Sequence, residues 1–246
     1  MSFLEGSQIA SVANIKAFFQ SSSSIWFLEG HCRVTASVCK QIVCRHKSDF
    51  TALIRRKLSR DFSSNKVTCY GLESEKLALN EYVKNMKTNE PKFCPQPTGL
   101  VISTESPWFA ASPDGLGTDP VHGNCIVEIK CLYLCRDMSI AMASQKPLFC
   151  LKADGVSILK RSHSYHCQVQ HQLCVTGVQW ADFVLWTPTE MFIERIKYDE
   201  PFMMANLVEL KAFYFDHFCL LYSQRFACRV LVEIRFSRHQ LVTFFS

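Results

Sequence analysis

The stretch NCIVEIKCLY, residues 124–133, decides the fold, because it reads as an apolar strand that carries two charges on one face. Side chains of a strand alternate between its two faces, so Glu128 and Lys130 point the same way. The intervening Val127, Ile129 and Cys131 then point into a core. A carboxylate beside an ammonium group is typical of a metal-dependent phosphodiesterase, in which the carboxylate holds a divalent cation.

Asp114 precedes this strand in the sequence, within the segment SPDG of residues 112–115. Taken alone, Pro-Asp-Gly is a common turn, and a Glu/Lys pair is a common salt bridge on a solvated sheet. The order Asp, Glu, Lys favours an active site instead. Asp114, Glu128 and the carbonyl of Ile129 offer the oxygen ligands that Mg²⁺ or Mn²⁺ prefers. Lys130 would orient or deprotonate a water molecule, or stabilise the charged phosphate.

Two predicted helices bring further polar groups to this centre. In the helix predicted over 71–86, Glu75 lies in an apolar stripe with Leu79 and Tyr82. An unpaired buried carboxylate is costly, so either a positive group meets Glu75 or it lies at the rim and reaches water. The helix predicted over 163–177 places Gln168 and Gln172 on one face, where an amide can hydrogen-bond the lysine or the water.

The same helix suggests a competing zinc site, made of His166, Cys167, His171 and Cys174. His and Cys are the ligands that zinc prefers. However, His166 and Cys167 are neighbours on a helix and diverge by about 100°. The spacing therefore disfavours zinc.

Composition indicates a globular protein, since 48% of the 246 residues are hydrophobic and 20% are charged. The net charge of +5 permits an anionic partner without requiring one. The 13 cysteines show no disulfide framework, so most are expected to be reduced. No apolar run has the length of a membrane span, and no secretory signal pattern is present. We expect a soluble intracellular protein, nuclear or cytoplasmic, with no membrane partner.

The remaining pattern predicts one α/β domain without internal repeats. We expect a helical extension over 1–24, a core domain over 25–225 and an atypical tail over 226–246. In that tail Glu233 and Arg235 repeat the charge pair of the opening strand, but without an upstream Asp or a following Gln helix. The predicted helices cover 8–20, 33–46, 71–86, 163–177 and 201–224, and the predicted strands cover 98–104, 107–111, 125–132, 180–187 and 191–198.

Five motifs in one order carry a resemblance to a known family. They are Arg33-Val-Thr-Ala-Ser37, Gly71-x-x-x-Glu75-x-x-Ala78-x-x-x-Tyr82, Ala111-Ser-Pro-Asp114-Gly-Leu116, Val127-Glu-Ile-Lys130-Cys131 and Tyr165-x-x-Gln168-Val-Gln170. Over roughly residues 25–220 the chain resembles the YqaJ-like viral recombinase domains. These are similar to phage lambda exonuclease, in the PD-(D/E)XK nuclease superfamily. The resemblance implies an α/β fold with a restriction-endonuclease-like core, a mixed central sheet flanked by helices.

The resemblance implies a Mg²⁺- or Mn²⁺-dependent nuclease that digests double-stranded DNA from its ends, and some relatives assemble as homo-oligomeric rings. By resemblance, Asp114 and Glu128 bind the metal and Lys130 serves catalysis. Glu75 supports the metal through water, and Gln168 positions the lysine or the water.

The resemblance also assigns phosphate contacts. Thr35 and Ser37 correspond to a helix N-terminus that faces the terminal phosphate of the DNA. Arg33 belongs to the same motif, and Arg136 takes the place of an arginine near the phosphates. Gly30 stands where many relatives carry an arginine. The alternative function is a non-catalytic DNA-binding or interaction module that retains the nuclease fold.

Overall fold

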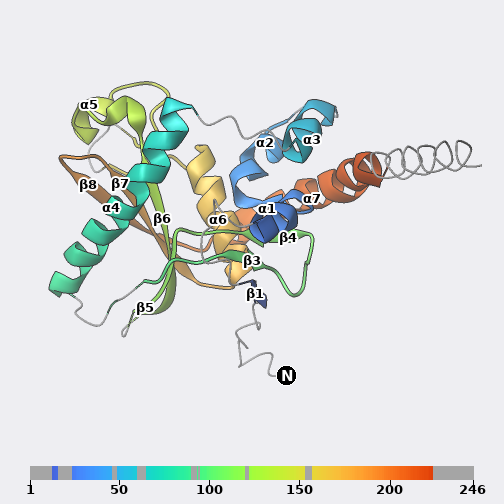
Figure 1. Ribbon diagram of the computed structural model, residues 1–246, viewed down its shortest axis with the longest axis horizontal. Helices are drawn as coiled ribbons and strands as arrows, with labels where there is room; N and C mark the ends of the chain where they lie inside the picture. Colours follow the sequence, from blue (N-terminus) through green and yellow to red (C-terminus); the bar gives the residue numbers. More distant parts are fainter. Residues whose placement is uncertain are drawn as a thin grey trace, which may run out of the picture.

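Two four-stranded β-sheets frame the part of the chain that the structure describes (Figure 1). The computed structural model describes residues 13–15, 24–45, 49–59, 65–89, 93, 95–119, 122–152 and 157–223. The first sheet has the strand order β1-β3-β4-β2, and the second has the order β5-β6-β7-β8. The strands are β1 Ala13–Ile15, β2 Val34–Thr35, β3 Leu100–Ile102, β4 Phe109–Ala111, β5 Gly115–Asp119, β6 Gly123–Cys131, β7 Trp180–Trp186 and β8 Met191–Lys197.

Helices pack around both sheets. The α-helices are α1 Ser24–His31, α2 Cys39–Val43, α3 Thr51–Leu58, α4 Lys66–Asn89, α5 Ile140–Ser144, α6 Ser164–Thr176 and α7 Glu200–Ala212. Short 3-10 helices cover Ala36–Val38 and Tyr133–Cys135, and α7 continues as a π-helical segment, Phe213–Phe218. Within the described ranges, no helix is both long enough and apolar enough to cross a membrane.

Strand β6 lies inside the second sheet, antiparallel to β5 and parallel to β7. Its register with β5 ends where Gly115 lies opposite Val127, whereas its register with β7 continues to Cys131 opposite Trp186. The last residues of β6 thus extend beyond the end of β5. At these residues the β5 edge of β6 has no strand partner within the described part of the chain, and a side chain contacts it instead, as described below.

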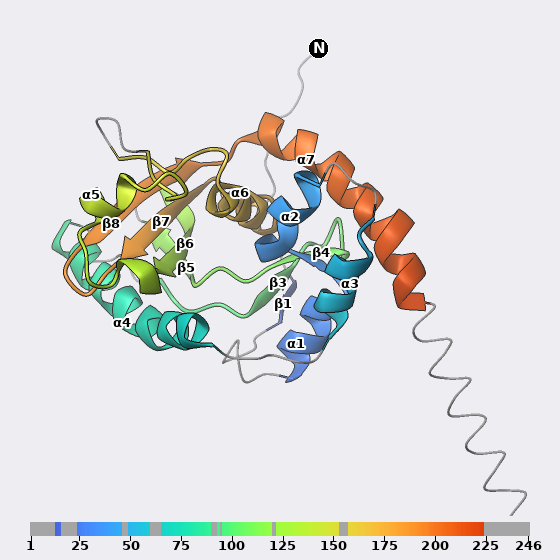
Figure 2. The same ribbon diagram turned by 90° about the horizontal axis from the view of Figure 1, so that it is seen from above.

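The two faces of β6 are covered by different helices. Val127 and Ile129 pack with Tyr82 of α4, whereas Ile126 packs with Val169 of α6. Figures 1 and 2 show α4 and α6 on opposite sides of this sheet. The predicted alternation of the strand is therefore confirmed, and the even-numbered residues of β6 face α6.

Local signals explain where α6 begins and ends. The ring nitrogen Nδ1 of His163, at the N-cap position, accepts a hydrogen bond from the backbone N–H of Tyr165 at 3.2 Å. Gly177 ends the helix in the left-handed conformation, with φ of 69°. Glycine adopts this conformation at no steric cost. The helix predicted over 163–177 is confirmed.

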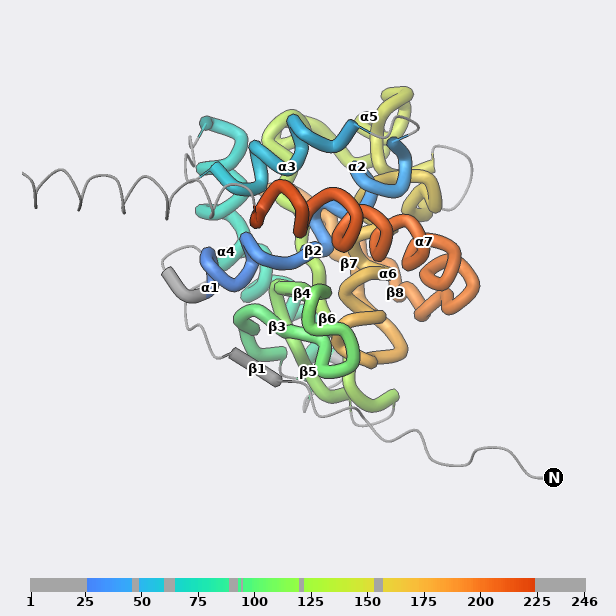
Figure 3. The backbone as a smooth tube through the Cα atoms, turned by 90° about the vertical axis from the view of Figure 1, so that its right-hand side faces the viewer, coloured from blue at the N-terminus to red at the C-terminus, as the bar shows by residue number. Residues whose placement is uncertain are grey.

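A further core joins the first sheet to α2, α3 and α7. Ile42 of α2, Leu53 of α3 and Met203 and Leu210 of α7 are buried in it together with Phe109 of β4. Figure 3 shows α7 running alongside α2 and α3. This core fixes the segment around Thr35 relative to the rest of the chain.

Several sequence-based boundaries are corrected by the structure. The helix predicted over 8–20 is wrong at Ala13–Ile15, which pair antiparallel with β3, because strand pairing overrides local helical spacing. The rest of that segment and the tail 226–246 lie outside the described residues. The helix predicted over 33–46 is replaced by the 3-10 helix Ala36–Val38 and the short α2.

Two other differences have identifiable causes. Helix α4 begins before Gly71 because the side chain of Asn65 accepts a hydrogen bond from the backbone N–H of Thr68 at 2.9 Å, a typical N-cap contact. Strand β5 was not predicted, since glycine has low strand propensity. Glycine fits the tight space at Gly117, where a Cβ would lie 3.1 Å from Cα of Pro95.

A buried hydrogen bond between α4 and β7 leads to the first prediction. The hydroxyl of Tyr82, which is 0% exposed, donates to Oδ2 of Asp182 at 2.7 Å. Replacing Tyr82 with Phe removes a hydrogen bond to a buried charge and should lower the free energy of unfolding by about 2 kcal/mol. Urea denaturation measures the loss. Tyr133→Phe is the control, because its ring contacts with Tyr70 and Arg136 survive the change. Equal losses of unfolding free energy in both variants would show that the hydrogen bond from Tyr82 to Asp182 does not have the stabilising role assigned to it.

Candidate active site

Glu128 is the centre of a hydrogen-bonded cluster between β6 and α6. Its side chain is 1% exposed. Oε1 accepts hydrogen bonds from the ammonium of Lys130 and from the amide of Gln168. Oε2 accepts from Nε2 of Gln172 at 2.6 Å. The predicted juxtaposition of Glu128 with Lys130 and Gln168 is therefore present, and both carboxylate oxygens are engaged.

Asp114 lies just before β5 and meets the exposed edge of β6. Its Oδ2 accepts a hydrogen bond from the backbone N–H of Ile129 at 2.7 Å. The N–H and C=O of one strand residue point towards the same edge of the strand. The carbonyl of Ile129 therefore points towards the edge of β6 at which Asp114 lies. Asp114 and this carbonyl could contribute to one metal site only from the same edge.

The electrostatics of the cluster are dominated by three acids. Burial, followed by the charge of Glu128, raises the pKa of Glu75 on α4. The same two causes raise the pKa of Asp114, and the charge of Glu75 adds to them. Burial alone would lower the pKa of Lys130, but Glu128 and Asp114 outweigh it and raise that pKa. Lys130 is thus the positive group predicted near Glu75.

Two further residues of α6 join the cluster beyond those predicted to act there. Gln172 binds Glu128 directly, and the ring centroid of Tyr165 lies 5.2 Å from Nζ of Lys130. The signal for Gln172 is its position one turn after Gln168, on the same face of the helix. Tyr165 belongs to the same motif, but its contact with the lysine depends on packing across the sheet.

The residues expected to contact phosphates have contacts with residues outside this cluster. Arg33 donates to the carbonyl of Pro107 at 2.7 Å and forms an ion pair with Glu29. Arg136 forms an ion pair with Asp137 at 3.0 Å, and its guanidinium lies 4.0 Å from the ring centroid of Tyr133. Among the described contacts, none joins Arg33 or Arg136 to Glu128.

Thr35 and Ser37 stand at the start of the 3-10 helix Ala36–Val38. Their hydroxyl oxygens lie 3.5 Å apart, and Thr35 occupies the N-cap position without a side-chain capping bond. Ser37 is exposed. The 3-10 helix packs against α6, the helix that carries Gln168. A helical start is present here, although the α-helix that follows is short.

The histidines and cysteines of the competing zinc site do not converge. His166 packs edge-on against Phe202, with ring centroids 5.1 Å apart, whereas His171 stacks on Phe109 at 3.8 Å. Burial lowers the pKa of His171 to about 3. Across the residues that the structure describes, no three His, Cys, Asp or Glu side chains gather as a metal-binding group.

The acid cluster nevertheless fits a divalent cation by the chemistry of its donors. The expected set needs only two carboxylates, Asp114 and Glu128, together with the backbone carbonyl of Ile129. Oxygen donors of this kind suit Mg²⁺, which usually keeps several waters. The charges of Glu128 and Glu75 both help to raise the pKa of Asp114, and a cation would relieve this repulsion. Glu128 would have to exchange one of its present donors for the metal.

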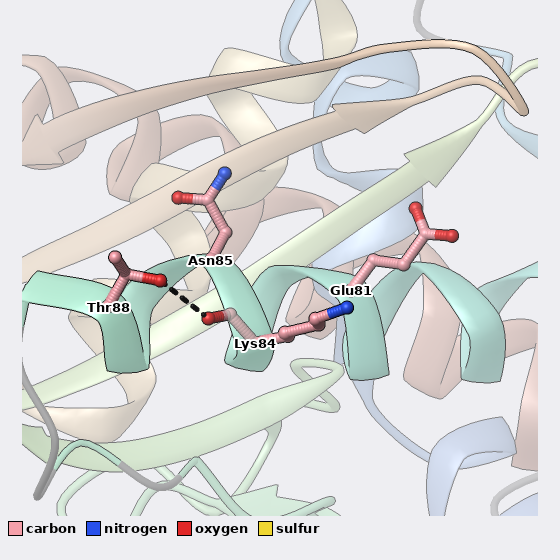
Figure 4. A pocket seen from close by; sticks show the side chains of 4 residues that line it. All are labelled: Glu81, Lys84, Asn85 and Thr88. Carbon is pink, nitrogen blue, oxygen red and sulfur yellow. Dashed lines mark hydrogen bonds between the residues drawn. The ribbon is translucent and has the colours of Figure 1, made fainter.

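A surface hollow elsewhere on α4 is unrelated to the cluster. It is lined by Glu81, Lys84, Asn85 and Thr88, all from this one helix (Figure 4). The hydroxyl of Thr88 donates to the carbonyl of Lys84 at 3.3 Å, within the helix itself. None of the four is a predicted site residue.

Solved structures with the same fold are known. An alkaline exonuclease, LHK-Exo, from Laribacter hongkongensis is 24% identical, with a TM-score of 0.60, over 85% of this chain and 100% of that chain. Its complex with dAMP is 23% identical with a TM-score of 0.62 at the same coverage. The chain is accordingly an α/β protein with a restriction-endonuclease-like core, in which mixed sheets are flanked by helices.

The family follows from the sequence itself. The family model of the YqaJ-like viral recombinase domain matches residues 26–179. The chain belongs to this family, which confirms the resemblance found in the motifs. A comparison with curated proteins found no match.

The raised pKa of Asp114 leads to the second prediction. The folded protein binds this proton more tightly than the unfolded chain does, so stability falls as the pH rises above the ordinary carboxyl pKa, and the loss is complete above the raised pKa. Asp114→Asn keeps an acceptor for the N–H of Ile129 and removes the charge. It should raise the free energy of unfolding of the metal-free protein at neutral pH by about 1 kcal/mol, at the expense of function.

Urea denaturation in EDTA at several pH values measures this difference. The wild-type protein should lose stability as the pH rises from the ordinary carboxyl range through the raised pKa, and the variant should lose less. Asp137→Asn is the control, because Asp137 is exposed. A lower stability of Asp114→Asn at neutral pH would contradict the prediction.

Proposed function

We propose that the chain is a divalent-metal-dependent deoxyribonuclease that hydrolyses phosphodiester bonds of double-stranded DNA from free ends. The observation that carries this proposal is the hydrogen-bonded pair of Glu128 and Lys130 next to Asp114, which binds the N–H of Ile129, with Glu75 close enough for its charge to act on Asp114. Membership of the viral recombinase family supports DNA as the substrate. The solved neighbour LHK-Exo is an alkaline exonuclease whose complex with dAMP is also known, which supports the same reaction.

Each residue of the cluster has a role in the proposal. Asp114, Glu128 and the carbonyl of Ile129 would hold Mg²⁺ or Mn²⁺. When bound, the metal lowers the pKa of a water ligand and neutralises charge on the phosphate. Glu75 would accept a hydrogen bond from a water molecule beside the acids.

Lys130 acts as a positive charge rather than as a base. Its neighbouring carboxylates keep it protonated, so it stabilises the negative charge that grows on the phosphate during the reaction. Gln168 and Tyr165 fix the direction of its side chain through Glu128 and through the aromatic ring. The buried position of Glu128 makes this arrangement rigid before substrate arrives.

Thr35 and Ser37 are proposed to meet the terminal phosphate, with Arg33 and Arg136 near the DNA backbone. Contacts to the backbone carry no direct sequence information and weaken with salt. Binding should therefore tolerate any sequence and fall steeply as the salt concentration rises. A homo-oligomeric ring around the duplex belongs to the same proposal, and light scattering of the purified protein measures its size.

The test is a comparison of linear and circular duplex DNA with the purified chain. Loss of linear DNA in Mg²⁺ or Mn²⁺, with intact covalently closed circles and no reaction in EDTA, is the expected result. Degradation of the circles would replace end-dependent action with endonuclease action. Absence of product from every substrate and metal would overturn the proposal.

A second function is favoured by one observation. Both oxygens of Glu128 already accept hydrogen bonds from protein groups, as they would in a structural network. A non-catalytic module that binds DNA would keep this network and need no metal. Tight binding of duplex DNA in EDTA, measured by fluorescence anisotropy, together with no hydrolysis in Mg²⁺ or Mn²⁺, would favour it.

A further inference from the structure

Two cysteines from different helices face each other inside the protein. Cys39 begins α2, and Cys167 lies in the first half of α6. Their Sγ atoms are 2.7 Å apart, and the residues are 0% and 1% exposed. Both are free thiols. A disulfide has an S–S distance of about 2.05 Å, so the sulfurs need to approach by less than about 1 Å.

The surroundings make the two thiols unequal. The hydrogen bond shared with Cys39 lowers the pKa of Cys167 and outweighs burial, which raises it, and the nearby charge of Lys40 lowers it further. The same hydrogen bond raises the pKa of Cys39 well above its usual range. Cys167 is therefore the better thiolate, and Cys39 keeps its proton. A thiolate beside a second thiol is the arrangement that disulfide formation requires.

We propose that Cys39 and Cys167 form a reversible disulfide when the folded protein meets hydrogen peroxide. The thiolate of Cys167 attacks one peroxide oxygen, the O–O bond breaks, and the departing hydroxide takes up a proton to give water. This leaves a sulfenic acid on Cys167. The sulfur of Cys39 then attacks that sulfur, loses its proton, and displaces the hydroxyl group as a second water. Two thiols lose two electrons, and one peroxide becomes two waters.

The bond would join segments that are 128 residues apart in the chain. Closing so long a loop restricts the unfolded chain strongly, so the oxidised protein should melt about 10 °C above the reduced protein. The disulfide would link α2, which follows Thr35 and Ser37, to the helix that carries Gln168. It consumes no group of the Glu128 cluster, so this inference does not depend on the proposed nuclease activity.

Burial restricts which oxidants reach the pair. Hydrogen peroxide is small, whereas oxidised glutathione is bulky and has to wait for local opening of the fold. Cys44, at the end of α2, is exposed and provides a matched thiol that both reagents reach.

The test starts from the reduced full-length protein in EDTA, treated with hydrogen peroxide. Remaining thiols are then blocked with N-ethylmaleimide in denaturant, and the digest is examined by mass spectrometry. The expected result is a linked peptide pair containing Cys39 and Cys167, which dithiothreitol separates. The melting temperature should rise by the stated amount in the wild type and in Cys44→Ser. It should not rise in Cys39→Ser or Cys167→Ser.

If a variant does not fold, the peptide analysis and the melting temperature of the wild-type protein are sufficient to test the proposed disulfide. Recovery of Cys39 and Cys167 as blocked thiols after Cys44 has been oxidised would overturn the proposal. So would linkage of either residue mainly to another cysteine, or an unchanged melting temperature in protein that carries the linked pair. Reaction with oxidised glutathione as fast as with peroxide would contradict the buried route.

Discussion

Glu128→Gln should lower the rate of DNA hydrolysis by about 10³-fold, roughly 4 kcal/mol of transition-state stabilisation. The amide keeps the shape and one acceptor for the donors that now surround Glu128. It removes the negative charge on which both the expected metal and Lys130 depend. Titration calorimetry with Mg²⁺ should show a matching loss of metal affinity.

Glu194→Gln is the matched control for this change. Glu194 lies on β8 in the same sheet, and its carboxylate accepts a hydrogen bond from the backbone N–H of Leu159 at 2.6 Å. We expect activity and Mg²⁺ affinity within about twofold of the wild type, because the residue is outside the cluster. Glu128→Gln with activity within tenfold of the wild type would remove Glu128 from the catalytic role.

Lys130→Met should lower hydrolysis by about 10²- to 10³-fold, the range seen when one group that stabilises transition-state charge is removed. The effect of Lys130→Met on Mg²⁺ affinity should have the opposite sign to the effect of Glu128→Gln. Removal of a positive charge beside three carboxylates should strengthen Mg²⁺ binding, while turnover falls. Lys130 contacts Glu128 directly, so the metal-free variant should also lose stability, and Mg²⁺ should restore it.

Paired measurement of turnover and metal affinity separates these roles. Lys146→Met, at an exposed position, is the control and should change neither quantity. Weaker Mg²⁺ binding in Lys130→Met would show that the lysine holds the site together rather than acting on the phosphate. Unchanged turnover would remove Lys130 from the catalytic role.

The sequence predicted the centre of the site because that part of it is local. Glu128 and Lys130 are two residues apart on one strand, and strand alternation alone places them together. Gln168 could be assigned to an inward face because helical spacing places it on the same face as Gln172. Strong local signals of this kind survive in the folded protein, since tertiary packing reinforces them.

Other parts could not be predicted because they depend on contacts between distant segments. The bond from Asp114 to the N–H of Ile129 requires β5 to begin opposite Val127, which no local pattern encodes. Strand β5 was not predicted because its glycines have low strand propensity, and one of them, Gly117, lies close to Pro95. The short helix after Thr35 is set by packing against α6 rather than by its own sequence.

The buried bond between Tyr82 and Asp182 has a consequence for the opposite face of the sheet. Asp182 also binds Arg195 of β8 at 3.1 Å, so a single carboxylate ties α4 to two strands. The ion pair of Asp182 and Arg195 lies on the α4 side of the sheet, opposite the side that the Glu128 side chain faces. It holds the strand in place, so that Glu128 could exchange hydrogen-bond donors for the proposed metal without a shift of the backbone. Side chains can then rearrange on one side of the sheet while the backbone that carries them stays still.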